Sequence, residues 1–206
     1  MTPVDLVSAL YRQVMVDVGD GAFVFVGGRP SLDFVATLGK RHASPVERLP
    51  DGDALARWLV LEGLVPAPPP VTDRELARAR ELREAIDGLV RSTIAGTAPG
   101  ARELRVVNTV AARPDLPPLL AVDTDGRTVA SGGAGTPAQA LSSIARDAAR
   151  LLGGPLAARI KECEHPDCSL VFLDETQSGR RRWCSMDRCG NLVKIAGYRA
   201  RRARSG

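Results

Sequence analysis

The chain has 206 residues, of which 44% are hydrophobic and 25% charged, as in ordinary globular proteins. It contains no apolar run of about 18 residues, so we expect no transmembrane helix. The N-terminal sequence lacks the basic leader of a secretory signal, and we therefore expect a cytoplasmic protein.

The formal net charge of +4 is distributed unevenly. Residues 155–206 contain eleven Arg or Lys against six Asp or Glu, whereas the rest of the chain contains 17 against 18. This excess predicts an acidic partner, such as nucleic acid, for the last quarter. Nearly all basic residues are arginine, and Ala, Gly and Pro are frequent. That composition is typical of GC-rich coding, so the abundance of arginine alone does not indicate a partner.

The first predicted element is an amphipathic helix over residues 2–14, with Thr2 as its cap and Pro3 at its first position. Its apolar face would be formed by Val4, Val7, Leu10, Tyr11 and Val14. Residues 23–26 predict a short strand. The following "SLDFVATL" fits either a second strand or the start of a capped helix.

Four further helices follow from apolar spacing and capping residues. They cover residues 51–65, capped by Asp51 or Asp53, and then 72–96, 101–113 and 136–153. The strongest is the helix over 72–96, because Thr72 and Glu75 form a capping box. Between the last two helices, residues 119–131 predict a hairpin that turns at Asp125-Gly126.

Residues 1–154 are therefore predicted to form a mostly helical α+β domain with small β-hairpins. Asp33 and His42 are candidates for a polar site, although structural roles are favoured for both. The chain has two histidines, no glycine-rich phosphate loop and no arguable Ser/His/Asp set, so we do not expect an enzyme.

All four cysteines lie in one short window, as Cys163-x4-Cys168 and Cys184-x4-Cys189 with fifteen residues between the pairs. Two such pairs provide the four thiolates of a tetrahedral, structural Zn²⁺ site. The alternatives are two disulfides, which a cytoplasmic location disfavours, or four unrelated buried thiols. His165 lies between the first two cysteines and is an alternative ligand.

The residues around the cysteines suggest a treble-clef-like zinc module over residues 155–206. Residues 169–183 predict a β-hairpin, with Leu170 and Phe172 in its strands and its turn at 177–179. Gly190 would let the backbone pass close to the Cys189 sulfur. Asn191 would either cap a helix after the last cysteine or hold the turn.

The segment "WCSMDRCGNLVK" followed by "YRARRAR" resembles the CGNR zinc finger, whose members carry an N-terminal ABATE domain. "SLDFVATL" and "DALARWLVLEGLV" resemble the opening of that domain. This resemblance implies that Cys163, Cys168, Cys184 and Cys189 bind one zinc ion, in a stress-related transcription regulator that binds DNA. The chain departs from the family pattern at Leu192, where the motif has arginine, and at Ala36, where it has asparagine.

The predicted nucleic-acid contacts are basic residues beside and after the cysteines: Arg180, Arg181, Arg182, Lys194, Arg199, Arg201 and Arg202. The N-terminal domain would sense a small ligand, dimerise or bind a protein partner. In the alternative interpretation, the module mediates protein–protein interaction, zinc is purely structural and the basic tail docks on an acidic partner. Four thiolates with one Zn²⁺ carry a net charge of about −2, so some of the basic charge would neutralise the metal centre.

Overall fold

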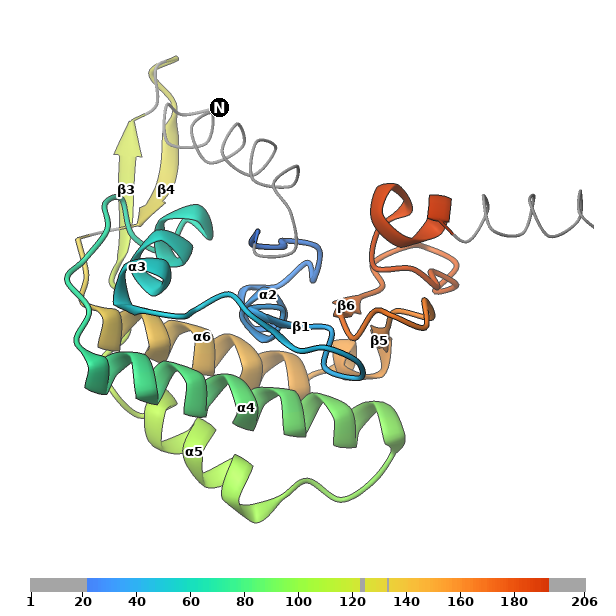
Figure 1. Cartoon of the computed structure of the whole chain (residues 1–206). Coiled ribbons are helices and arrows are strands. Elements are labelled where there is room, and N and C mark those ends of the chain that lie inside the picture. Colours follow the sequence, from blue (N-terminus) through green and yellow to red (C-terminus); the bar gives the residue numbers. More distant parts are fainter. Residues whose placement is uncertain (1–21, 123–124, 133, 193–206) are drawn as a thin grey trace, which may run out of the picture.

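The computed structural model describes residues 22–122, 125–132 and 134–192 of the chain (Figure 1). The helix predicted over residues 2–14 lies outside these ranges. The described helices are α2 (Pro30–Val35), α3 (Gly52–Leu61), α4 (Asp73–Ala95), α5 (Ala101–Ala111) and α6 (Pro137–Leu152). Helices α4, α5 and α6 pack along one another at one side of the molecule. No helix within the described ranges combines the length and apolarity needed to cross a membrane.

The helix boundaries follow the capping residues of the sequence. Asp51 caps α3, because its side chain accepts a hydrogen bond from the Ala54 amide. Thr72 and Glu75 close a reciprocal capping box at the start of α4, and Thr136 and Gln139 form a second one on α6. At the end of α4, Gly96 adopts a φ of 65°, a left-handed conformation that glycine accepts without strain.

The main hydrophobic core lies between α2, α3, α4 and α6. Trp58 on α3 is completely buried, with its ring centroid 5.1 Å from that of Phe34 on α2. The rest of the core is aliphatic, and Leu55, Leu59, Leu82 and Ile86 are fully buried. Leu55, Trp58 and Leu59 therefore form the buried face of the helix predicted over residues 51–65.

The strand predicted over residues 23–26 is wrong, because this segment is extended without forming a ladder. Arginine side chains bind its backbone instead: Arg48 donates to the Ala22 carbonyl over 2.7 Å. Phe23 and Phe25 pack edge to face with centroids 6.4 Å apart, and Phe25 stacks on Trp58. The segment after it, which fitted either a strand or a helix, forms the short helix α2.

Three small antiparallel pairs of strands complete the fold. Strand β1 (Leu38–Gly39) pairs with β2 (Val46–Glu47). Strand β3 (Pro118–Val122) pairs with β4 (Thr128–Gly132), and Gly126 has a φ of 75° between them, so the hairpin predicted there is confirmed. Strand β5 (Ile160–Glu162) pairs with β6 (Val171–Leu173). This mixture of helices and small hairpins confirms the predicted α+β class.

The hairpin predicted inside residues 169–183 is wrong in its pairing. Strand β6 pairs with β5, which precedes the first cysteine, in the register Ile160 to Leu173. A turn does form near the predicted place, where the Gly179 amide bonds to the Thr176 carbonyl over 3.1 Å and Gly179 has a φ of 59°. The pairing places β5 and β6 directly beneath the cysteines.

The chain on either side of residue 154 packs together closely. Ile160, Val171 and Leu173 belong to the same core as Trp58. Arg91 on α4 also donates to the carboxylate of Glu162 on β5 over 3.0 Å. The division into domains at residue 154 stays a prediction, and the two segments share one core in the structure.

Candidate metal centre

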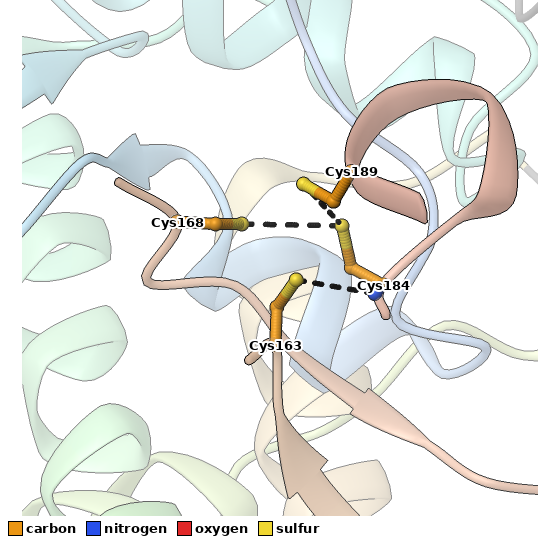
Figure 2. Close-up of side chains that lie close together, drawn as sticks. All are labelled: Cys163, Cys168, Cys184 and Cys189. Atoms are coloured by element: carbon orange, nitrogen blue, oxygen red, sulfur yellow. Dashed lines mark hydrogen bonds between the residues drawn. The ribbon is translucent and has the colours of Figure 1, made fainter. Parts of the chain in front are cut away.

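The four cysteines converge on one point from four short segments (Figure 2). Cys163 directly follows β5, Cys168 lies in the turn before β6, and Cys189 lies in a single helical turn over Met186–Gly190. Cys184 approaches from the extended segment before that turn. The four Sγ atoms lie within 4.8 Å of one another. The window of cysteines in the sequence is therefore one cluster in space.

The sulfur spacing suits a tetrahedral ion. The Sγ atoms of Cys168 and Cys184 are 3.9 Å apart, and those of Cys184 and Cys189 are 3.6 Å apart. Metal–sulfur bonds of about 2.3 Å at tetrahedral angles require sulfur atoms about 3.8 Å apart. All four cysteines are free thiols, and these separations far exceed the ~2.05 Å of a disulfide. The donor set thus fits a thiophilic metal ion such as zinc.

Backbone hydrogen bonds shape the two cysteine pairs. The Cys163 amide bonds to the Leu170 carbonyl over 2.9 Å, and the Cys168 amide bonds to the His165 carbonyl over 2.9 Å. These bonds close the first cysteine turn. In the second pair, the Cys184 amide points at the Cys163 sulfur over 3.4 Å. An amide aimed at sulfur stabilises the thiolate form that a metal requires.

The four thiols perturb one another's pKa values strongly. Hydrogen bonds from Cys168 and Cys184 hold the pKa of Cys163 far below its usual value. Hydrogen bonds to Cys163 and Cys168 raise the pKa of Cys184, and burial raises the pKa of Cys189 to about 12. The cluster can therefore carry one negative charge easily but not four. A bound divalent cation would reverse this balance and ionise all four sulfurs.

An apolar shell surrounds the sulfurs and includes residues from far upstream. Val24, Ala36, Leu170 and Phe172 are buried in one small cluster with Cys163, Cys184 and Cys189. Ala36 is the position where the family pattern has asparagine, and here its side chain is 3% exposed. Its methyl group therefore serves the shell of the metal centre. Asp33, three residues earlier, accepts a hydrogen bond from the Gly27 amide over 2.8 Å.

Arg181, predicted to contact nucleic acid, binds the backbone of the metal centre. Its Nε donates to the Trp183 carbonyl over 2.9 Å, and its Nη2 donates to the Cys184 carbonyl. Its guanidinium carbon also lies 4.4 Å from the centroid of the Phe172 ring. These contacts orient the segment that carries Cys184.

Asp174 organises the loop that leads back to the second cysteine pair. Its side chain is fully buried and accepts hydrogen bonds from Lys161 over 2.7 Å, from the Thr176 hydroxyl over 2.6 Å and from the Arg181 amide over 2.9 Å. The Lys161 ammonium, followed by the Thr176 hydroxyl, holds the pKa of this carboxyl well below its usual range. Sequence reasoning missed this role. The spacing of Asp174 and Thr176 at the end of a strand is the signal that indicates it.

The remaining predicted nucleic-acid residues differ in their surroundings. Arg180 is exposed. Arg182 is also exposed, but it pairs with Glu164 over 2.6 Å and lies over the Trp183 ring, 5.1 Å from its centroid. The other four predicted residues, Lys194, Arg199, Arg201 and Arg202, lie outside the described part of the chain.

The last helical turn begins earlier than predicted, and its glycine has a different role. Ser185 caps the turn by accepting a hydrogen bond from the Arg188 amide over 3.2 Å, so Asn191 is not the cap. A Cβ on Gly190 would lie 2.6 Å from the Met186 sulfur and 3.3 Å from the Trp183 ring. The glycine therefore admits these two side chains rather than the Cys189 sulfur.

Neither histidine joins the cysteine cluster. The His165 ring accepts a hydrogen bond from the Asp167 amide over 3.2 Å, which stabilises the first cysteine turn. His42 contacts Glu162 over 2.7 Å. Glu162 therefore bonds to both His42 and Arg91, next to the first cysteine. Sequence reasoning missed this bridge, because its members are far apart in the chain.

Comparisons with known proteins agree with this geometry. Residues 28–155 match a family model named ABATE and described as "Putative stress-induced transcription regulator". Residues 159–202 match the model of the CGNR zinc finger, which spans all four cysteines. A search of curated proteins gave no match. The helical fold, the cysteine cluster and these two adjacent matches together show that the chain belongs to the ABATE family and carries a CGNR zinc finger.

Proposed function

We propose that the protein is a DNA-binding transcription regulator whose four cysteines hold one structural Zn²⁺. The observation that carries this proposal is the buried four-sulfur cluster, which the chain follows directly with its most basic segment. The metal would fix Cys184 and Cys189, and with them the start of the arginine-rich C-terminal sequence. The family description supports a regulatory role. A cytoplasmic location, which we also propose, would keep the thiols reduced.

The chemistry of the donor set favours a structural metal over a catalytic one. Catalytic zinc keeps a coordination position for water, whereas four thiolates fill a tetrahedral site. Cys163, Cys184 and Cys189 are each less than a tenth exposed, so bulk water has little access to their side of the cluster. We therefore propose that the protein is not an enzyme.

The positive charge available for DNA comes from only some of the arginines. Arg181 is occupied by backbone carbonyls and Arg182 by Glu164. Of the three adjacent arginines, Arg180 is the one whose guanidinium makes no bond to another described residue. We propose that Arg180 contacts phosphate together with Lys194, Arg199, Arg201 and Arg202. Arg181 then supports binding indirectly by shaping the metal centre.

Binding of the zinc-loaded full chain to a mixed-sequence duplex across a salt series tests this function. With four to six phosphate contacts, we expect log K to fall against log salt with a slope of about −4 to −5. The double variant Arg201→Glu/Arg202→Glu should flatten the slope, whereas the exposed Arg57→Glu on α3 is the matched control. Single-stranded RNA in the same series shows whether the duplex is preferred. Retention unaffected by the double variant would remove DNA binding from the proposal.

The second candidate function is a protein-interaction module in which the basic tail docks on an acidic partner. The pairing of Arg182 with Glu164 favours it, because a carboxylate already satisfies a guanidinium on this surface. A stoichiometric partner that co-purifies with the protein, with no salt-sensitive retention on DNA, would support this candidate over the first. The zinc would have the same structural role in both.

A further inference from the structure

A cavity of about 370 Å³ lies between α4, α5 and the beginning of α6, far along the chain from the cysteines. Its floor is apolar and includes Val106, Val110 and Leu141. Its walls carry three arginines: Arg78 from α4, Arg105 from α5 and Arg113 from the segment that follows α5. The volume is in the range of small-molecule sites, which are commonly apolar with a few convergent polar groups.

These three arginines gather around one cavity, and none of them forms an ion pair with another residue that the structure describes. Elsewhere the arginines that pack against the helices form ion pairs: Arg29 with Asp147, Arg41 with Glu84, Arg83 with Glu47, Arg91 with Asp87 and Arg146 with Asp115. Across the ranges that the structure describes, the guanidinium groups around the cavity donate no hydrogen bond and form no ion pair. Arg78 is moreover partly buried.

The two carboxylates that line the cavity are engaged elsewhere. Glu75 belongs to the capping box of α4, where its Oε2 accepts hydrogen bonds from the Thr72 amide over 2.9 Å and the Thr72 hydroxyl over 2.8 Å. Glu81 lies 3.8 Å from Arg102, and both residues line a neighbouring cavity. The cavity thus combines an apolar floor with three arginines against two carboxylates, and neither carboxylate pairs with these arginines in the described part of the chain.

We propose that this cavity binds a small organic anion, with a carboxylate against Arg78 and Arg105 and an apolar portion on Val106 and Val110. Guanidinium groups bind carboxylates through paired, charge-assisted hydrogen bonds, and an apolar tail removes the floor from water. The inference goes beyond the proposed function and concerns the N-terminal domain, for which the sequence suggested sensing of a small ligand. It does not depend on DNA binding, since the cavity and the metal centre are separate.

Isothermal titration of octanoate into the zinc-loaded full chain is the first test. We expect a dissociation constant on the order of 0.1–1 mM, as is reasonable for so small a ligand. Octanol has the same apolar portion without the charge and should bind at least about tenfold more weakly. Inorganic phosphate has the charge without the tail and should also bind weakly. Absence of heat with octanoate up to about 10 mM would overturn the proposal.

Substitutions in the walls locate the site. Arg78→Gln and Arg105→Gln should each weaken octanoate binding by about tenfold or more. Arg105 is exposed, so its variant is expected to fold normally, and circular dichroism checks this. The control is Arg74→Gln, an exposed arginine on α4 that does not line the cavity. Equal affinity in all three variants would show that octanoate binds elsewhere and contradict the proposal.

The two proposals fail in distinguishable ways. Heat of octanoate binding measures only the cavity, whereas salt-dependent retention on a duplex measures only the basic C-terminal segment. Loss of octanoate binding in Arg78→Gln with unchanged DNA retention would support the cavity assignment by itself. If the protein binds octanoate but is not retained on DNA, the result supports anion binding in the cavity and contradicts only the proposed DNA binding.

Discussion

The helical core and the metal centre are adjacent, yet they are held together by different forces. The core around Trp58 consists of apolar side chains that are almost completely buried, and its helices are closed by capping boxes. The centre around the four cysteines has a small apolar cluster, and its loops depend on Lys161, Asp174 and Arg181. Burial of apolar surface can stabilise the first region without help. We expect the second to require a metal ion bound by its four sulfurs.

Removal of the metal should produce the largest difference between the two regions. Structural zinc sites contribute free energy on the order of 10 kcal/mol in small modules, so a chelator should unfold the cysteine loops while α3, α4 and α6 remain helical. Trp183 packs on the cysteine cluster and reports the change by fluorescence in a Trp58→Phe background. The Trp58 Nε1 has no hydrogen-bond partner among the described residues, so this background substitution costs no hydrogen bond there. Helical ellipticity that falls together with Trp183 fluorescence would show that the regions are not independent.

The substitution Trp58→Ala should have the next largest effect, and on the helical core. Truncation of a completely buried tryptophan costs about 3–5 kcal/mol of the free energy of unfolding. Urea unfolding followed by circular dichroism measures this loss, and Arg57→Ala, at an exposed neighbouring position, is the control. We expect metal content at saturating zinc to stay unchanged in the folded variant. A loss below about 1 kcal/mol would contradict the role of Trp58 as the centre of the core.

Arg181→Lys should weaken the metal centre by an intermediate amount. Lysine keeps the charge but cannot reach both carbonyls with one planar group or stack on Phe172 in the same way. We expect a loss of about 1–3 kcal/mol in the stability of this region, seen as faster zinc release to a chelator. Arg180→Lys is the matched control, because Arg180 is exposed and its guanidinium bonds to no other residue that the structure describes. Equal release rates in the two variants would argue against the orienting role of Arg181.

Acidification should reveal a smaller electrostatic contribution in the helical region. Burial opposes ionisation of Glu47, but hydrogen bonds and charge from Arg83 outweigh it and lower the pKa of this carboxyl. Its contribution to stability is therefore full above the unfolded pKa of about 4.3 and is lost as the pH falls through the lower folded pKa.

Glu47→Gln tests this contribution directly. The variant should lose about 1 kcal/mol at pH 7, since Glu47 is about one-third exposed. It should then lose less than the parent protein between pH 5 and pH 3, as measured by urea unfolding. A constant difference between the two proteins across this range would mean that Glu47 titrates normally.

The sequence predicted well what local chemistry determines. Helical spacing and the Thr72–Glu75 capping box placed α4, and the x4 spacing of the cysteines predicted their cluster. The pairing of β5 with β6 was not predicted, because the partner of Val171 lies before the first cysteine and depends on tertiary contacts. Glu162 was missed for the same reason, since it meets His42 and Arg91 from distant parts of the chain. Arg181 shows that an arginine-rich motif does not reveal which guanidinium faces the protein.

Strand β5 has a consequence for how such a finger could be inherited. Its three side chains contact three different parts of the molecule. Ile160 packs in the helical core, Lys161 binds Asp174, and Glu162 binds His42 and Arg91. A finger transplanted onto another helical domain would lose two of these three attachments at once. The unit that recombination can exchange therefore includes α4 and the segment around His42. Fingers and helical domains of this kind are expected to diverge together along a lineage rather than be shuffled separately.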